Sequence, residues 1–180
     1  SVICSDKTGT LTRNEMTARS LVTTAGVVEV IGTGYEPRGE FSREGRALEA
    51  DDDPLLAELL RAGLLCNDAQ VRTDGPGHPR MAGDPTEAAL VVAALKAGLD
   101  PHGLADRWPR RDVIPFESEH RFMATLHRGH DGRGVIYLKG APERVLEMCS
   151  GERHGNDTRP LNAAAWHEWI AALAARGQRV

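Results

Sequence analysis

Three stretches of the chain carry apolar residues at helical spacing. Residues 54–66 place leucines along one stripe behind an acidic start and a proline, which is typical of a helix N-terminus. Residues 85–97 are apolar on almost all sides and predict a buried helix. A helix is also expected over 162–176, and a short one over 142–149. Two aromatic residues of the 162–176 segment share its apolar face and are expected in the core: Trp166 and Trp169.

Between these segments, the pattern favours strands joined by tight turns. Two β-rich runs meet across Ala25-Gly26 and predict a hairpin, and two more flank a turn-rich segment at 130–134. Residues 32–45 hold several glycines and are expected as loop or edge strand. The expected strands are 16–24, 27–31, 113–116, 122–127 and 135–138. Strands and helices mix without regular alternation, so the predicted class is α+β, a mostly antiparallel sheet flanked by helices.

Composition narrows the possible functions. The chain has 180 residues and a net charge of −4, with dispersed basic residues, so nothing favours a nucleic acid as partner. No apolar run approaches the roughly 18–20 residues that span a bilayer. The seven histidines show no metal-ligand spacing, and there is no Walker-type phosphate loop.

The sharpest chemical signal is the string Asp6-Lys7-Thr8-Gly9-Thr10-Leu11-Thr12. It places a carboxylate just after an apolar strand end, followed by a turn rich in hydroxyl groups. Such a carboxylate can attack a phosphoryl group, while lysine and threonine supply charge and hydrogen bonds to phosphate oxygens. The alternative is an ordinary capped turn, but the full string favours a functional site.

This string resembles the phosphorylation signature of P-type ATPases. The resemblance implies that Asp6 is the phosphorylated aspartate, that Thr8 contacts phosphate and that Lys7 belongs to the same catalytic motif. It also implies a Mg²⁺ held by Asp6 and Thr8 in the full protein only. The motifs are closer to the calcium, sodium-potassium and proton pumps than to the heavy-metal pumps.

Later segments resemble the nucleotide-binding domain of the same family, in the expected order. They are Leu65–Asp68, Gly83–Leu90, Pro115–Glu119 and Lys139–Glu143. The resemblance implies that ATP is the ligand and that a set of residues surrounds it. These expected nucleotide contacts are Glu87, Phe116, Arg121, Met123, Lys139, Gly140 and Arg179.

The residues themselves leave alternatives open. Phe116 offers a flat face for a base or fills the core, and Met123 lines the pocket or fills the core. Glu87 accepts a hydrogen bond from adenine or closes its own helix in a capping box. Lys139 follows an apolar strand and precedes a glycine, yet an ordinary solvated lysine would look the same. Arg121 binds phosphate or is simply solvated.

The resemblance also predicts how the chain is divided. Residues 1–14 are expected to belong to a phosphorylation domain, 15–176 to a nucleotide-binding domain, and 177–180 to the return into the phosphorylation domain. Both ends are expected to continue in a longer protein. Its phosphorylation, actuator and membrane domains are then the expected partners, and the chain is expected to be a cytoplasmic part of an integral membrane protein.

Two further functions remain possible from the sequence. The chain by itself is expected to bind adenine nucleotides without catalysis, since the rest of the pump lies elsewhere. A soluble phosphatase with an aspartate nucleophile is a weaker hypothesis. Those enzymes usually carry a second aspartate two residues after the first, where this chain has Thr8.

Overall fold

The computed structural model describes residues 15–72 and 80–180. The phosphorylation motif, with Asp6, Lys7 and Thr8, lies outside the described residues. The helices are η1 (Ala50–Asp52, a 3₁₀ turn), α1 (Pro54–Leu65), α2 (Pro85–Lys96), α3 (Pro101–Arg107), α4 (Pro142–Met148) and α5 (Ala163–Ala175). The strands are β1 (Ser20–Thr23), β2 (Gly26–Val30), β3 (Phe41–Arg43), β4 (Arg46–Leu48), β5 (Gln70–Arg72), β6 (Arg80–Ala82), β7 (Arg110–Glu117), β8 (Phe122–Arg128), β9 (Gly134–Gly140), β10 (Glu152–His154) and β11 (Asp157–Arg159).

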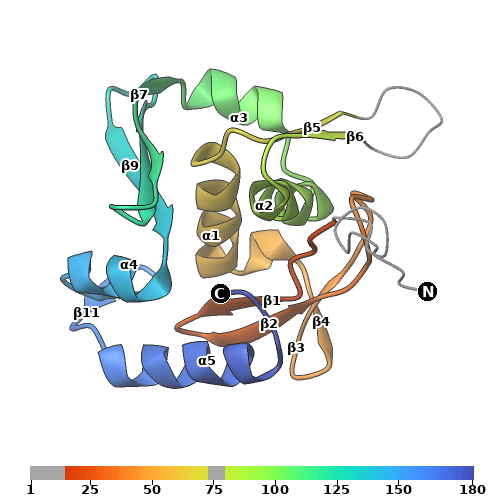
Figure 1. Cartoon of the computed structure of the whole chain (residues 1–180). Helices are drawn as coiled ribbons and strands as arrows, with labels where there is room; N and C mark the ends of the chain where they lie inside the picture. The colour runs from red at the N-terminus through yellow and green to blue at the C-terminus, as the bar shows by residue number, and fades with distance from the viewer. Residues whose placement is uncertain (1–14, 73–79) are drawn as a thin grey trace, which may run out of the picture.

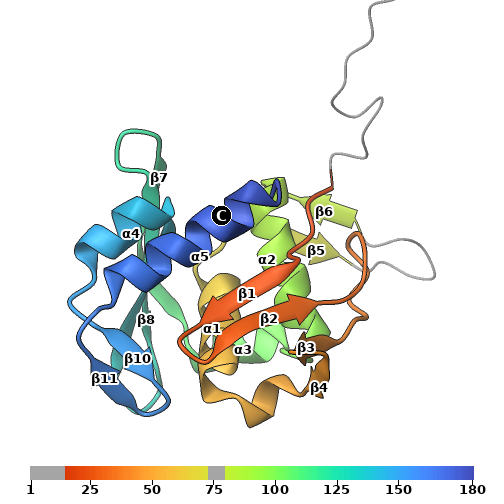
Figure 2. The same ribbon diagram turned by 90° about the horizontal axis from the view of Figure 1, so that it is seen from below.

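The predicted α+β class is confirmed, although the strands divide into separate sheets. A four-stranded sheet has the order β1-β2-β3-β4, a three-stranded sheet has the order β7-β8-β9, and β5-β6 and β10-β11 form two hairpins. All the pairs are antiparallel. Figures 1 and 2 show α1 and α2 between the β1–β4 sheet and the β7–β9 sheet.

Three helices begin with the same dipeptide, an aspartate followed by proline. Asp53, Asp84 and Asp100 precede α1, α2 and α3, and each side chain accepts hydrogen bonds from two backbone N–H groups of the first turn. Proline fits the first helical position because its missing N–H would have no partner there. The same signal therefore fixes the start of all three helices, including α3, which its short apolar pattern did not predict.

The core lies on both sides of α1. On one side, Val28, Phe41 and Leu56 are buried between the β1–β4 sheet and α1. On the other, the C-terminal end of α1 packs on β8 and β9 through Leu65 and Met123, together with Cys66 and Tyr137. Helix α1 thus connects the two sheets and fixes their relative position.

Helix α5 corrects one expectation about the core. Its Trp166 and Trp169 are only half-buried, and Leu173 is the one buried residue of the helix. The two rings meet edge to face at 5.0 Å, and Trp166 Nε1 donates to Glu152 Oε2 at 2.7 Å. Because the indole N–H needs a polar partner, the pair stays at the periphery. Figures 1 and 2 show α5 running along the outside of the molecule, past β1 and β2.

None of the helices in the described ranges is both long and apolar enough to cross a membrane.

Candidate functional site

Residues from three adjacent strands lie at the same level of the β7–β9 sheet. Met123 of β8 pairs with Lys139 of β9. On the other side, the pairs Ile114–Ala124 and Glu117–Phe122 leave Pro115 and Phe116 of β7 opposite Met123. Two residues against one is the pattern of a β-bulge, and a proline without an N–H is tolerated at a bulge of an edge strand. We call Phe116, Met123 and Lys139 the cross-strand row.

Phe116 is exposed at the start of this row. Its exposed fraction is 57%, so the structure excludes the alternative in which it fills the core. Core packing does not explain a phenylalanine that is exposed to this degree, and its ring is accessible for stacking on a flat ligand.

Lys139 lies at the other end of the row and contacts Glu87 from α2. Lys139 Nζ is 2.5 Å from Glu87 Oε1, and the exposed fractions of the two side chains are 23% and 17%. The residues are 52 positions apart in the chain. The pair brings together two motifs that the sequence analysis assigned to one ligand, and it shows that Lys139 is not an ordinary solvated lysine.

The Glu87 carboxylate also fails to close its own helix. Its Oε2 accepts a hydrogen bond from the backbone N–H of Asp68 at 3.2 Å. The first turn of α2 is capped instead by Asp84, which accepts from the N–H groups of Thr86 and Glu87. The capping-box role of Glu87 is therefore replaced by contacts across the site.

A polar cluster behind Glu87 was not identified from the sequence as part of the site. Asn67 is buried, and its Nδ2 donates to the carbonyl oxygens of Gly63 and Glu87, both at 2.9 Å. Asp68 forms an ion pair with Arg110 at 2.6 Å, and Arg110 also donates to the carbonyl oxygen of Asn67. The segment Leu65–Asp68 resembled a family string, and here it ties the end of α1 to the start of α2. Only that resemblance could have signalled its role.

Met123 and Gly140 support the site from within the fold. Met123 is 1% exposed and packs in the core with Leu65 and Tyr137. Its backbone belongs to the cross-strand row, but its side chain is part of the interior. A Cβ on Gly140 would lie 2.4 Å from the carbonyl oxygen of Arg121 and 2.7 Å from Cα of Phe122. Gly140 is thus required where the end of β9 passes close to the start of β8.

Arg121 lies in the turn that leads into β8, with a left-handed φ of 58°. Its Nη1 is 2.8 Å from Oε1 of Glu143 in the first turn of α4, and both side chains are about half exposed. Because Arg121 precedes Phe122, its backbone lies beside the cross-strand row, while its guanidinium group reaches α4. Among the described residues, its ionic partner is this carboxylate of α4.

Arg179 is exposed near the C-terminal end of the described chain and contributes to the electrostatics at the start of α2. Burial raises the pKa of the Asp84 carboxyl, but backbone N–H donors of Glu87 and Thr86 and the Arg179 charge outweigh burial and lower that pKa. Arg179 therefore lies within electrostatic reach of the helix end that carries Glu87. In the part of the chain that the structure describes, Glu87 and Lys139 are in contact, and Arg179 forms no hydrogen bond or ion pair with either of them.

Two other ionisable groups near the row remain neutral at physiological pH. Burial raises the pKa of the Cys66 thiol, even though Lys139 and Arg110 act in the opposite direction. Burial and a hydrogen bond to Glu58 raise the pKa of Tyr137 to about 12. Neither group therefore adds a charge to the site, and the Cys66 thiol is not a reactive thiolate.

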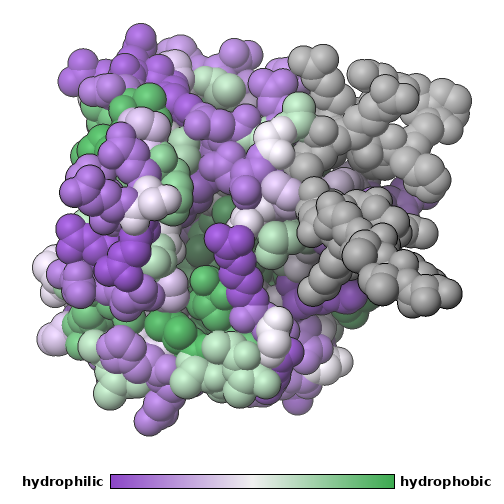
Figure 3. All heavy atoms as spheres, in the orientation of Figure 1, coloured by the Kyte–Doolittle hydropathy of each residue, from purple (hydrophilic) through white to green (hydrophobic). Residues whose placement is uncertain are grey.

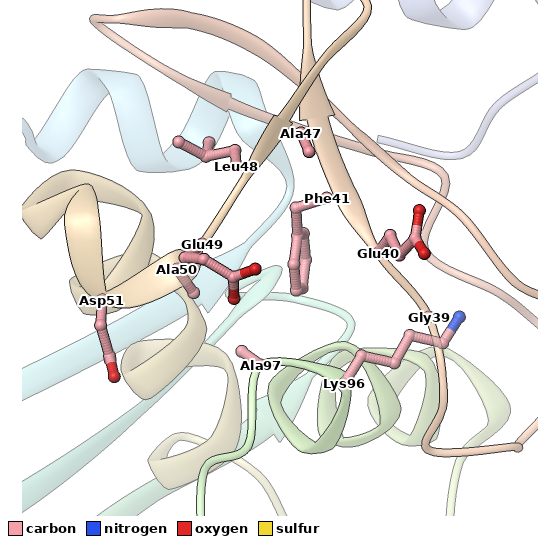
Figure 4. Close-up of a pocket in the computed structure, with 10 residues that line it drawn as sticks. All are labelled: Gly39, Glu40, Phe41, Ala47, Leu48, Glu49, Ala50, Asp51, Lys96 and Ala97. Atoms are coloured by element: carbon pink, nitrogen blue, oxygen red, sulfur yellow. The ribbon is translucent and has the colours of Figure 1, made fainter.

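The surface has hollows that do not contain the predicted residues. Figure 4 shows one of about 280 Å³, in which the ring of Phe41 lies between the carboxylates of Glu40 and Glu49. Another, of about 440 Å³, lies beside Trp108 and Arg110. Figure 3 shows apolar residues gathered in the middle of the face seen in Figure 1, surrounded by hydrophilic residues. Neither hollow includes Glu87, Phe116 or Lys139.

Comparison with known proteins shows the family to which the chain belongs. The family model described as the cytoplasmic domain N of P-type ATPases matches residues 55–180. A cation-transporting ATPase, pma1, of Synechocystis sp. is 47% identical over 154 residues, which are 82% of this chain and 17% of that protein. A probable cation-transporting ATPase F of Mycobacterium bovis is 42% identical over 188 residues, 99% of this chain and 20% of that protein.

A calcium-transporting ATPase type 2C member 1 of Bos taurus is 42% identical over 153 residues, 83% of this chain and 15% of that protein. The family model and these relatives define the class, a cytoplasmic domain of a P-type ATPase. The chain belongs to the P-type ATPase family and corresponds to its cytoplasmic domain N. It spans between 15% and 20% of the length of these three relatives.

Proposed function

We propose that this chain is the ATP-binding part of a cation-transporting P-type ATPase and that it holds adenine between Phe116, Glu87 and Lys139. The observation that carries the proposal is the contact of Lys139 with Glu87 at 2.5 Å, at one end of a row that has the exposed Phe116 at its other end. These three residues come from three separate sequence motifs and lie on β7, at the start of α2 and on β9.

Each of the three side chains matches a different property of adenine. The Phe116 ring offers an apolar face, and stacking of a base on such a ring contributes about 1–3 kcal/mol. The Glu87 carboxylate accepts a hydrogen bond from the exocyclic amino group, while the Lys139 ammonium donates to a ring nitrogen. The ion pair thus presents an acceptor and a donor side by side, as an adenine edge requires.

The phosphates are then contacted by arginines at the margin of the site. Arg121 is half exposed beside the row, and Arg179 is exposed near the start of α2. A guanidinium group binds phosphate oxygens through two parallel hydrogen bonds. Because adenine is bound while most of the phosphate charge faces outward, we expect a dissociation constant of about 0.1 to several mM for ATP, which corresponds to about 3.5–5.5 kcal/mol.

In the whole pump, the Asp6 carboxylate attacks the γ-phosphorus of ATP, so that an aspartyl-phosphate forms and ADP leaves. Mg²⁺ would supply charge neutralisation on the phosphate oxygens, with Asp6 and Thr8 among its contacts and Lys7 beside them. Water then hydrolyses the aspartyl-phosphate, and the released free energy drives a cation across the membrane. The phosphorylation, actuator and membrane domains are the partners of this chain in that cycle, and the chain alone binds nucleotide without turnover.

The test is a titration of the 180-residue chain with AMP and with ATP, followed by amide NMR. Saturable shifts around Glu87, Phe116 and Lys139 are expected with both nucleotides. Phe116→Ala is expected to weaken both by about 5- to 100-fold, the equivalent of 1–3 kcal/mol of stacking. Ile114→Ala removes a similarly exposed side chain from the same strand and is expected to bind like the wild type. Absence of shifts up to about 10 mM nucleotide would contradict the proposal.

A further inference from the structure

We infer that Glu143 sets the affinity of this site for the phosphate groups of a nucleotide, because it occupies the guanidinium group of Arg121. The inference rests on the proposed function. It extends that function by identifying a carboxylate within the chain that competes with the phosphates for Arg121. The starting observation is the distance of 2.8 Å between Arg121 Nη1 and Glu143 Oε1.

The backbone holds the two residues in this position. The carbonyl oxygen of Arg121 accepts a hydrogen bond from the N–H of Ala141 at 2.9 Å, and the N–H of Arg121 donates to the carbonyl oxygen of Glu117 at 2.8 Å. Gly140 allows the close passage of the two segments. The turn before β8 is therefore fixed against the start of α4, and the two side chains meet as a result of this crossing.

The pair lies next to the residues proposed to hold the base. Phe122, which follows Arg121, pairs with Gly140, and the next pair along the two strands is Met123 with Lys139. A nucleotide whose base contacts Lys139 therefore has the Arg121 side chain in the region that its phosphates enter. For as long as Glu143 pairs with this arginine, the phosphates must displace a carboxylate to reach it.

The two carboxylate–cation pairs of the site differ in strength. The Glu87–Lys139 pair is mostly buried, with exposed fractions of 17% and 23%, whereas the Arg121–Glu143 pair is 50% and 53% exposed. An exposed pair is weak and screened by salt. A polyphosphate with several negative charges and a bidentate fit to the guanidinium group displaces it, so Glu143 lowers phosphate affinity without closing the site.

The chain offers a matched control on the same helix. Glu147 lies one turn further along α4, and its carboxylate pairs with Arg144 at 2.9 Å. Glu143→Gln and Glu147→Gln remove the same charge from the same short helix, but only the first releases Arg121. A comparison of the two separates the specific contact from the general effect of one negative charge.

The experiment measures dissociation constants of ATP and of adenosine, the phosphate-free probe, for the wild-type chain and these variants by calorimetry or NMR. Glu143→Gln is expected to strengthen ATP binding by about two- to fivefold, the range that corresponds to an exposed ion pair. Adenosine binding is expected to stay unchanged. In an Arg121→Ala background, Glu143→Gln is expected to have no effect on ATP affinity.

Three results would overturn the inference: an unchanged ATP affinity in Glu143→Gln, an equal gain in Glu147→Gln, or a gain that persists without Arg121. The proposed function fails differently. If adenosine and ATP do not bind the wild-type chain, or if Phe116→Ala binds both as well as the wild type, the adenine site itself is wrong and the inference falls with it.

Discussion

At the scale of single residues, the contact between Lys139 and Glu87 contributes to the stability of the fold as well as to the proposed nucleotide site. Glu87 is mostly buried and its carboxylate receives one ammonium group and one backbone N–H. Removal of the ammonium group leaves the Glu87 carboxylate partly buried with a single hydrogen-bond donor. A buried charge without its partner destabilises a fold more than the intact pair stabilises it.

We therefore expect Lys139→Met to lower the free energy of unfolding by about 1–2 kcal/mol, less than for a fully buried pair. The measurement is urea unfolding at pH 7, where the midpoint falls and the slope stays constant. Addition of Glu87→Gln to this variant removes the unpaired charge and is expected to recover part of the loss. Arg144→Met, which breaks the exposed pair with Glu147, is the control and should cost less than about 0.5 kcal/mol. Equal losses in both single variants would contradict this account.

Asp53 provides a prediction for pH. Burial raises the pKa of its carboxyl, but the hydrogen bond and charge of Arg43, together with the N–H groups of Leu56 and Leu55, outweigh burial and lower that pKa. A lowered pKa in the folded state means that the charged form stabilises the fold at pH values above the unfolded pKa. This contribution is lost as the pH falls through the folded value.

Asp53→Asn keeps a helix cap but loses the ion pair. It is expected to lower the free energy of unfolding by about 1–2 kcal/mol at pH 7, with the difference shrinking below about pH 4. Urea midpoints from pH 7 to pH 2.5 measure this. Asp100→Asn, at the exposed cap of α3, is expected to change stability by less than about 0.5 kcal/mol throughout. A difference for Asp53→Asn that stays constant with pH would show that the ion pair does not act as described.

At the scale of elements, the end of β9 depends on a glycine. The two nearest backbone atoms to a Cβ at Gly140 belong to Arg121 in the turn before β8 and to Phe122 at the start of β8, and backbone cannot move as a flexible side chain can. Gly140→Ala is expected to lower the free energy of unfolding by about 1–3 kcal/mol and to weaken AMP binding, because β8 and β9 separate beside Lys139.

Gly134 gives the matched control at the other end of the same strand. The nearest atom to a Cβ there is at 3.9 Å, an ordinary contact. Gly134→Ala is expected to change the free energy of unfolding by less than about 0.5 kcal/mol, and AMP binding should stay as in the wild type. Thermal unfolding of both variants, with and without AMP, tests this. A Gly140→Ala variant as stable as Gly134→Ala would contradict the close crossing.

The sequence predicted those elements that leave a long periodic pattern or a strong start signal. Helices α1 and α2 and the β8–β9 hairpin lie close to their expected positions. The pairs β3–β4 and β10–β11 have strands of three residues, too short to show alternation. Helix α3 has seven residues and no buried side chain, so only its Asp-Pro start could have indicated it.

For the candidate site, the sequence predicted residue types but not contacts. The resemblance supplied Glu87 and Lys139, yet their ion pair joins α2 to β9 across 52 positions, a contact that no local pattern predicts. The exposure of Phe116 and the burial of Met123 follow from the bulge and the register, which no local pattern specifies. The Arg110–Asp68 pair depends in the same way on distant elements.

At the scale of the whole molecule, the residues proposed to bind adenine all lie in the region after residue 14. We therefore expect that a chain of residues 15–180 binds AMP with less than about a twofold change in affinity relative to the 180-residue chain. Thermal unfolding should also shift to higher temperature with AMP to the same extent in both chains, because ligand binding to the folded state stabilises it.

The same reasoning separates binding from phosphoryl transfer. Asp6→Asn is expected to leave AMP and ATP affinity unchanged in the 180-residue chain, since the proposed role of Asp6 is in phosphoryl transfer. Nucleotide titrations of both chains test this point. A loss of AMP affinity of more than about tenfold on removal of residues 1–14 would show that the expected division of the chain at residue 15 is wrong.

The open position of Phe116 on an edge strand has a consequence for timing. A base that stacks on this ring as proposed is not enclosed by the residues that the structure describes, because the ring itself is 57% exposed, and we expect the base to leave directly into water. With an association rate constant of about 10⁷ M⁻¹s⁻¹ and millimolar affinity, nucleotide leaves this site roughly 10⁴ times per second. Exchange of spent for fresh nucleotide is then much faster than typical enzyme turnover of about 1–10³ per second. For the proposed pump cycle, we therefore expect the slow steps in the movements between domains and in phosphoryl transfer to Asp6.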